Sequence, residues 1–238
     1  MFDYKKIIVI GCPGSGKSTF VRKLGEIVQL PIHHMDMMYW NEDCSHISRD
    51  ELISKLNHVF DSAEWIIDGN YKHTLEMRME QCELIYFFDL STEVCIHGAI
   101  HRTYRPDVPC DLPANDTLIN FIKNFNIDGK PQIVELMNKY PDKKVITFRS
   151  HKEVDSYVED LKDSFELWDV YDKNRNQTGE VISRYDFFND TNSAYHLCVH
   201  VWIKNDKGEW LISKRTPNKS FPLLWSAQAV LYWLVRAV

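Results

Sequence analysis

The chain has 238 residues and a formal net charge of −6, with 28 Lys and Arg against 34 Asp and Glu. This acidic balance argues against direct nucleic-acid binding, because proteins that bind nucleic acids usually present a basic face. Apolar residues make up 44% and charged residues 26%, which fits a globular protein and excludes a disordered chain. No apolar run approaches the ~20 residues of a membrane-spanning helix, so no membrane partner is expected. The six cysteines form no CxxC pair, which favours reduced thiols and a cytoplasmic location.

Between residues 5 and 164, short apolar runs alternate with segments of helical period. The strands expected from this pattern are Ile7–Ile10, Pro31–Met35, Trp65–Ile67, Leu84–Phe88 and Val145–Phe148. The helices expected are Lys17–Val28, Arg49–Phe60, His73–Cys82, Thr92–Tyr104, Leu118–Tyr140 and Lys152–Lys162. Ser48, followed three residues later by Glu51, predicts a capping box at the start of the second helix. Short apolar strands separated by helices predict an α/β fold, with a parallel sheet covered by helices on both faces.

The pattern changes near Phe165, and we expect a domain boundary there that separates residues 1–164 from residues 165–238. The later segments with strand or turn character are Glu166–Asp172, the turn Asn174–Gly179, Tyr195–Ile203 and Glu209–Ser213. The last two flank a turn at residues 205–208, which is typical of a hairpin. The oligomeric state cannot be read from these patterns.

The run Gly11–Ser18 matches the pattern GxxxxGK[ST] without a mismatch. It follows an apolar strand and opens a helix, which is the context of a phosphate-binding loop. Glycines let backbone amides turn toward phosphate oxygens, Lys17 can reach the β- and γ-phosphates, and the Ser18 hydroxyl can ligate Mg²⁺. The motif therefore predicts binding of ATP and Mg²⁺. The residues expected to contact the nucleotide are Gly11, Pro13, Gly14, Ser15, Gly16, Lys17, Ser18 and Thr19.

Two carboxylates stand at the ends of predicted strands beside this loop. Asp36 ends the second strand, at the carboxyl edge where open α/β sheets bind ligands, and we assign it to the phosphoryl acceptor as orienting group or base. Asp68 ends the third strand, where a carboxylate can hold a magnesium-bound water. A strand-end turn or a helix cap is the alternative for either residue alone. Their occurrence together beside a phosphate loop favours a functional role.

Arg102 and Arg105 are three residues apart and share a helix face, just before a Pro- and Asp-rich loop at residues 106–116. An arginine-bearing lid neutralises the transferring phosphoryl group and excludes water, so we assign these residues, with Lys17, to catalysis. A solvated helix face is the alternative for such a pair. These features together predict an ATP-dependent kinase of a small-molecule acceptor, and a non-catalytic nucleotide-binding regulator is the alternative.

The segments IIVIGCPGSGKSTFVRKL, LPIHHMD and EWIIDGNYKHTLEMRM resemble the small P-loop proteins named for DNA topology modulation, which are similar in turn to adenylate and shikimate kinases. The resemblance covers residues 5–164. It implies a nucleoside-kinase-like P-loop sheet, ATP binding and phosphoryl transfer. It also places Arg78 near the arginine that grips the acceptor's phosphate. The loop RPDVPCDLPAND departs from the family pattern, because Cys110 stands where the family has an aromatic residue.

The segments ELWDVYDKNRNQTGEVISR and YHLCVHVWIKNDKGEWLISKRTPNKSFPLLWSA resemble Nudix hydrolases of the isopentenyl-diphosphate-isomerase-like branch, over residues 166–227. The resemblance implies that His196 is a metal ligand and that Arg215 contacts a diphosphate. An ordinary histidine on a half-buried strand is the alternative for His196. The family's glutamate-bearing pattern Gx5Ex7REUxEExGU, where U is aliphatic, does not occur in the sequence.

Because those glutamates hold the catalytic metal, we expect an incomplete α+β Nudix fragment that lacks hydrolase activity. Hydrolysis of nucleoside diphosphate derivatives by a full-length form is the alternative function. We also expect that a frameshift has truncated a longer kinase–Nudix fusion. A natural short tail is the alternative to the frameshift.

Overall fold

The computed structural model describes residues 2–101, 108–109, 114–189, 195–196, 206–208, 213–214 and 225–226. Its contacts divide the chain into two units, Met1–Phe165 and Glu166–Val238, and each is described by itself. Among the described residues, no helix is long and apolar enough to cross a membrane. The cytoplasmic location stays a prediction.

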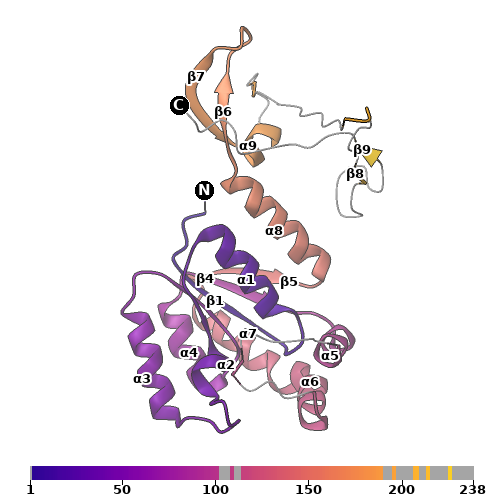
Figure 1. Cartoon of the computed structure of the whole chain (residues 1–238). Coiled ribbons are helices and arrows are strands. Elements are labelled where there is room, and N and C mark those ends of the chain that lie inside the picture. The colour runs from indigo at the N-terminus through magenta and orange to yellow at the C-terminus, as the bar shows by residue number, and fades with distance from the viewer. Residues whose placement is uncertain are drawn as a thin grey trace. The chain divides into compact units, whose positions relative to one another are not determined.

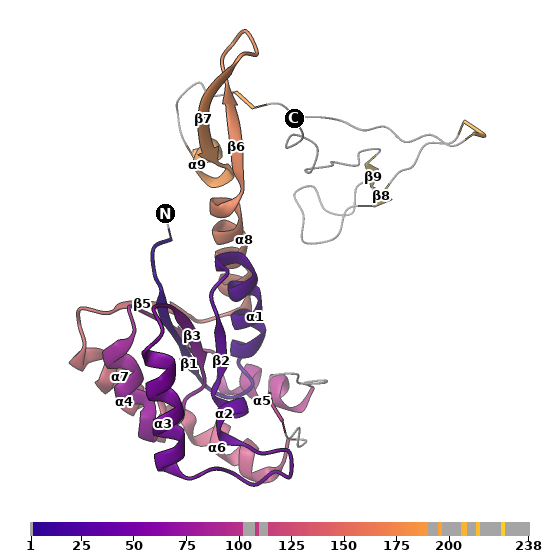
Figure 2. The same ribbon diagram turned by 60° about the vertical axis from the view of Figure 1, so that its left-hand side comes forward.

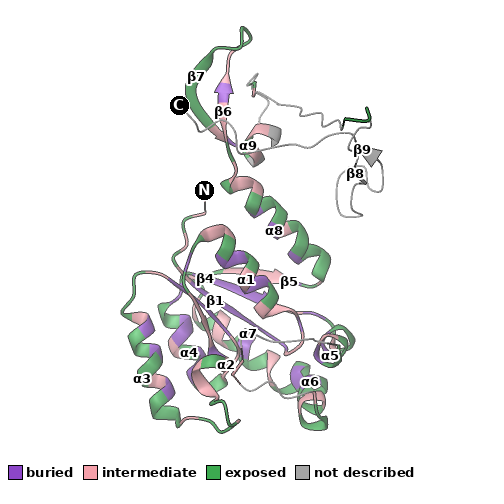
Figure 3. Ribbon diagram, viewed as in Figure 1, coloured by how far each residue is buried: buried purple, intermediate pink, exposed green. Residues whose placement is uncertain are grey.

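The first unit is built around a five-stranded sheet of order β2-β3-β1-β4-β5, in which every neighbouring pair is parallel (Figure 1). The strands are β1 (Lys6–Gly11), β2 (Ile32–His34), β3 (Trp65–Asp68), β4 (Leu84–Phe88) and β5 (Lys144–Phe148). Strands β1, β3 and β4 are buried along almost their whole length (Figure 3). This burial on both faces explains why their sequences are continuous apolar runs and do not alternate. The predicted α/β class is confirmed.

Eight helices are described in the first unit. They are α1 (Lys17–Val28), α2 (Met35–Tyr39), α3 (Arg49–Phe60), α4 (Lys72–Gln81), α5 (Thr92–Ile100), α6 (Asp116–Asp128), α7 (Lys130–Lys139) and α8 (His151–Phe165). Helices α1 and α8 lie on one side of the sheet, and α3, α4 and α7 lie on the other (Figures 1 and 2). Both faces are therefore covered, as a parallel sheet requires.

A cluster of aromatic rings holds α1 against the sheet. Phe20, 1% exposed, lies 4.9 Å from Tyr86, 5.4 Å from Phe88 and 5.5 Å from Phe148, measured between ring centroids. The hydroxyls of Tyr86 and Tyr157 are 2.7 Å apart, which joins α8 to the same cluster. Full burial of a phenylalanine side chain contributes about 1.5–3 kcal/mol. Because α1 directly follows the phosphate loop, this packing also fixes where the loop ends.

The predicted helix Leu118–Tyr140 is wrong as a single element, since α6 and α7 are separate helices joined at Gly129. Pro131 lies at the start of α7. A proline there fits the first turn of a new helix but would clash with the preceding turn of a continuous one. The predicted helix Thr92–Tyr104 is confirmed as far as Ile100, and its last three residues lie outside the described part of the chain.

The second predicted strand also ends early. Strand β2 stops at His34, and the short helix α2 begins at Met35. Asp36 therefore lies in the first turn of a helix and not at a strand end, which corrects the sequence-based placement. A short apolar run does not by itself distinguish a strand from a helical turn, and a carboxylate in a first turn is favoured by the helix dipole.

The second unit contains the antiparallel hairpin β6 (Leu167–Tyr171) and β7 (Gln177–Ser183), followed by α9 (Arg184–Asn189). The strands β8 (Ser213–Lys214) and β9 (Trp225–Ser226) form a second antiparallel pair. Tyr195 adds an isolated bridge to Tyr171. Most of the predicted strands Tyr195–Ile203 and Glu209–Ser213 lies outside the described residues. The assignment of this unit to an incomplete Nudix fragment stays a prediction.

Among the described cysteines, Cys44 departs from the expectation of reduced thiols. Cys44 is disulfide-bonded, whereas Cys12, Cys82 and Cys95 are free and buried.

The predicted capping box of α3 is confirmed. The Ser48 hydroxyl accepts a hydrogen bond from the Glu51 amide, and the Glu51 carboxylate accepts one from the Ser48 amide. Ser48→Ala is expected to lower the free energy of unfolding by about 1 kcal/mol, since it removes the acceptor of a helix-end amide. Urea unfolding of the full chain measures this loss. Ser62→Ala is the control, because Ser62 is exposed and is not the N-cap of a helix. This substitution should change the free energy of unfolding by less than about 0.5 kcal/mol.

Candidate active site

The phosphate loop joins β1 to α1 and is shaped by glycines with positive φ. Gly14 has φ 78° and Gly16 has φ 96°, which is the left-handed region that side chains rarely adopt. A Cβ on Gly14 would come within 2.1 Å of the Cys95 carbonyl oxygen, so the loop packs directly on α5. The imidazole of His151, at the start of α8, lies 3.0 Å from the Ser15 carbonyl oxygen. The loop is thus held in a fixed curve by the helices around it.

The N-terminus of α1 has the properties of an anion site. Its N-cap is Gly16, no side chain caps its amides, and its first turn has no acidic residue. Free amides and the positive end of the helix dipole together favour a bound phosphate. The Ser15 hydroxyl is completely buried in this loop without a hydrogen-bond partner in the structure. A buried hydroxyl with no partner is costly, and a phosphate oxygen in the loop would supply one.

Lys17 folds back over the loop, and its Nζ donates to the Cys12 carbonyl oxygen at 2.8 Å. Burial lowers the pKa of Lys17, and the nearby carboxylates of Asp68 and Asp36 oppose that shift. The ammonium group is thus poorly hydrated and close to acidic side chains. Such a group gains favourable electrostatic energy when phosphate oxygens arrive.

Asn70, which the sequence analysis did not single out, ties the end of β3 to the start of the phosphate loop. Its side-chain amide accepts from the Gly11 amide at 2.9 Å and donates to the Gly11 carbonyl oxygen at 2.7 Å. This double hydrogen bond resembles one rung of a sheet ladder. No motif in the sequence marks Asn70, because the contact spans 59 residues.

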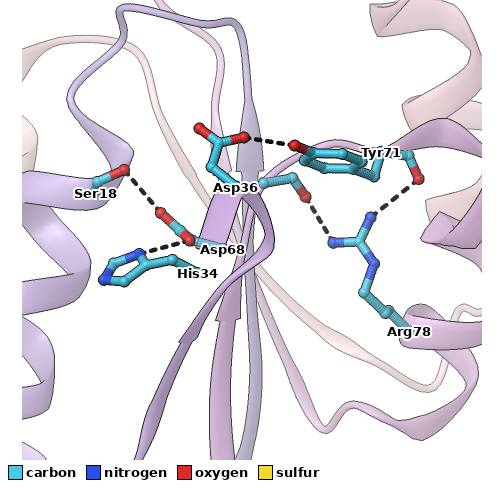
Figure 4. A network of polar contacts seen from close by, with 7 residues as sticks. Ser18, His34, Asp36, Asp68, Tyr71 and Arg78 are labelled. Carbon is cyan, nitrogen blue, oxygen red and sulfur yellow. Dashed lines mark hydrogen bonds and ion pairs between the residues drawn. The ribbon is translucent and has the colours of Figure 1, made fainter. Parts of the chain in front are cut away.

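Asp68 lies at the end of β3 and is 5% exposed, as expected of a carboxylate that faces the phosphate loop. Its Oδ2 accepts a hydrogen bond of 2.8 Å from the Ser18 hydroxyl, and its Oδ1 lies 2.8 Å from Nδ1 of His34 (Figure 4). Hydroxyl and carboxylate oxygens are the ligand types that Mg²⁺ prefers. Ser18 and Asp68 therefore fit a magnesium site, and His34 is a site residue that the sequence analysis did not single out.

In the part of the chain that the structure describes, no group of three or more His, Cys, Asp or Glu side chains gathers to hold a metal ion. A magnesium ion at Ser18 would thus need oxygens from another source, and nucleotide phosphates commonly provide them.

Asp36 and Tyr71 form a second polar pair at the same sheet edge. The Tyr71 hydroxyl donates to Asp36 Oδ1 at 2.7 Å (Figure 4). Burial, more than the neighbouring Asp36 carboxylate, raises the pKa of Tyr71, so its hydroxyl keeps its proton. Tyr71 has φ 31°, an uncommon conformation for a residue with a side chain, and precedes α4. Such strained backbone persists only where surrounding contacts hold it.

Arg78 provides those contacts. The side chain is fully buried, and its guanidinium donates to the carbonyl oxygens of Gly69, Asn70, Tyr71 and Thr74. Burial lowers the pKa of Arg78 to about 10, which leaves it protonated at neutral pH. Because its donors are directed at backbone oxygens, this geometry does not support the expected direct grip on an acceptor's phosphate. Arg78 instead holds the loop that carries Tyr71.

The other predicted site residues are distributed as follows. Thr19 is exposed on the first turn of α1, and Pro13 is half-buried in the phosphate loop. Arg102 and Arg105 lie outside the described residues, so their predicted role in catalysis stays a prediction. Arg215, which the Nudix resemblance assigns to a diphosphate, and Cys110 also lie outside the described residues.

His196, in the second unit, packs among aromatic rings. It stacks on Trp168, with ring centroids 4.2 Å apart, and meets Phe187 edge-on at 4.6 Å. These contacts fit the alternative of a half-buried histidine, and its role as a metal ligand stays a prediction.

Comparison with solved structures finds proteins of similar fold at low identity. A shikimate kinase from Bacteroides thetaiotaomicron is 15% identical, with a TM-score of 0.43, over 67% of this chain and 97% of that chain. A shikimate kinase from Acinetobacter baumannii in complex with shikimate is 12% identical, with a TM-score of 0.44, over 65% and 91%. A gluconokinase from Sinorhizobium meliloti 1021 is 16% identical, with a TM-score of 0.42, over 66% and 89%.

No protein-family model matches the chain, and no curated protein matches it either. The resemblances to the topology-modulation proteins and to Nudix hydrolases therefore stay predictions.

Proposed function

We propose that the first unit binds ATP with Mg²⁺ and transfers the γ-phosphoryl group to a small-molecule acceptor. The observation that carries this proposal is the position of the phosphate loop beside Asp68 and Asp36 at one edge of the sheet. The Ser18–Asp68 contact and the uncapped N-terminus of α1 support a phosphate and metal site on one side. The Asp36–Tyr71 pair supports an acceptor site on the other.

In this proposal the loop amides and Lys17 bind the phosphates. Ser18 would hold the magnesium ion directly, and Asp68 would hold it through a bound water. Magnesium, when bound, would neutralise phosphate charge and orient the phosphoryl group. Asp36 orients the acceptor's hydroxyl and takes its proton as the phosphoryl group is transferred. Arg102 and Arg105 would offset the charge of the phosphoryl group in transit.

The proposal is tested by incubating the full chain with Mg²⁺, ATP labelled at the γ-phosphate and a panel of small hydroxyl compounds and nucleoside monophosphates. The expected result is transfer of label to one class of acceptor, with ADP released in equal amount. Absence of nucleotide binding, measured in parallel with a fluorescent ADP analogue, would overturn the proposal. Nucleotide binding with no transfer of label to any compound and no release of free phosphate would instead favour a non-catalytic nucleotide-binding regulator.

Tyr71→Phe is expected to lower kcat for the accepted compound about tenfold while leaving the KM for ATP unchanged. The substitution removes one hydrogen bond to the ionised Asp36 carboxylate, and a hydrogen bond to a charged group contributes about 1.5–3 kcal/mol. Steady-state kinetics at saturating ATP measures the effect. Tyr39→Phe is the matched control, since it removes a hydroxyl from a neighbouring ring whose centroid lies 5.0 Å from that of Tyr71. An equal loss in both variants would show that the effect does not come from the hydrogen bond between Tyr71 and Asp36.

A further inference from the structure

Strands β2 and β3 bring His34 and Asp68 together. The two residues are direct partners in the parallel register, and their side chains are 15% and 6% exposed. Nδ1 of His34 lies 2.8 Å from Oδ1 of Asp68. An ionised carboxylate only accepts hydrogen bonds, so Nδ1 must carry a proton and donate it to this contact. The pair is nearly dry, which strengthens such a bond.

The carboxylate of Asp68 therefore accepts hydrogen bonds from two donors, one at each oxygen. One oxygen accepts from His34 and the other accepts from Ser18, the second residue of α1 (Figure 4). With both oxygens engaged, the carboxyl plane cannot turn without breaking a hydrogen bond in a buried place. Without the imidazole donor, Oδ1 would be buried with one partner fewer, and only the hydrogen bond from Ser18 would orient the carboxylate.

We infer that His34 is a positioning residue that holds the Asp68 carboxylate in the orientation that serves Ser18 and a nucleotide-bound magnesium ion. This inference rests on the proposed function, because it assigns Ser18 and Asp68 to magnesium. His34 acts through Asp68 and touches neither nucleotide nor acceptor in this assignment. Partners that orient the ligands of a metal typically change metal affinity by about 10–100-fold when removed.

The test measures how strongly Mg²⁺ tightens the binding of a fluorescent ADP analogue. Titrations with excess Mg²⁺ and with EDTA are made for the wild-type chain and for His34→Phe, which keeps a planar ring but no donor. His34→Asn places an amide donor near the position of Nδ1 and serves as the conservative variant. His33→Phe is the matched control, because successive side chains of a strand point to opposite faces.

The expected result is that His34→Phe binds the analogue in EDTA as the wild type does and loses about tenfold of the tightening by Mg²⁺. His34→Asn should recover most of it, and His33→Phe should match the wild type. In an Asp68→Ala background, His34→Phe should have no further effect, because the residue on which it acts is gone.

Two results would overturn the inference alone while nucleotide binding stands. One is an unchanged magnesium effect in His34→Phe, and the other is a loss in His34→Asn as large as that in His34→Phe. Should His34→Phe fail to fold, His34→Gln replaces it, because its amide extends past the Nδ1 position and is expected to give the same loss. A wild-type chain that binds no nucleotide in either titration overturns the proposed function itself, and this inference with it.

Discussion

Lys17→Ala is expected to lower kcat/KM for ATP by at least about 100-fold. In the proposed function, Lys17 is the one side chain of the phosphate loop that brings a positive charge to the phosphates. Its donation to the Cys12 carbonyl oxygen holds it over the loop. Removing a single electrostatic contact to the charge that develops in a transition state commonly costs 10²–10³ in rate, as order-of-magnitude values. The measurement is the initial rate of ADP formation, with circular dichroism to verify that the variant is folded.

Lys23→Ala is the matched control for this experiment. Lys23 lies on the same helix, but its ammonium pairs with Asp155 at 3.4 Å on an exposed surface. Exposed ion pairs contribute little, so its removal should leave turnover within about twofold of the wild type. Turnover in Lys17→Ala at the level of Lys23→Ala would remove the phosphate loop from the proposed mechanism.

Arg78→Met is expected to lower the free energy of unfolding by roughly 3 kcal/mol. The substitution keeps an unbranched side chain of similar length but leaves the carbonyl oxygens of Gly69 and Asn70 without the donors that they have now. Each buried acceptor without a partner costs about 1–3 kcal/mol, and relief from burying the guanidinium charge offsets part of that loss. Urea unfolding of the full chain, followed by circular dichroism, measures the change.

Arg78→Lys should not restore this stability, because one ammonium cannot reproduce the fork of donors that serves several carbonyl oxygens. Arg49→Met, at an exposed position in the first turn of α3, is the control and should change stability by less than about 0.5 kcal/mol. If Arg78→Met were as stable as that control but lost affinity for the acceptor, the sequence-based assignment of Arg78 to the acceptor would be reinstated.

Much of the fold was predictable, because its signals are short in sequence. Strand β4 and helices α1 and α3 have the predicted ends, and the α3 cap was expected from two residues alone. The errors fall where a local signal was ambiguous or was overlooked. The hydrophobic periodicity predicted one helix over Leu118–Tyr140, but two helices form there, and Pro131 lies at the start of the second. Helix α2 begins where the predicted strand Pro31–Met35 was expected to end.

The sequence by itself determined the phosphate loop. Its glycines, Lys17 and Ser18 lie within eight consecutive residues, so their spacing alone fixes how they can surround a phosphate. Only the tertiary structure decided what the other polar residues do. Ser18, His34 and Asp68 meet because β2 pairs with β3 and α1 packs beside them.

The same holds for Tyr71 and Arg78. The hydroxyl of Tyr71 donates to Asp36 across 35 residues. Arg78, which the family resemblance placed near the acceptor's phosphate, is buried and binds the backbone of the loop before α4. The contact of Tyr71 with Asp36 depends on the order of the strands, which brings together residues that are distant in the chain. The contacts of Arg78 lie only four to nine residues away, but their geometry depends on the turn between β3 and α4. A local pattern names the residue types, whereas the register of the sheet decides which of them share a hydrogen bond.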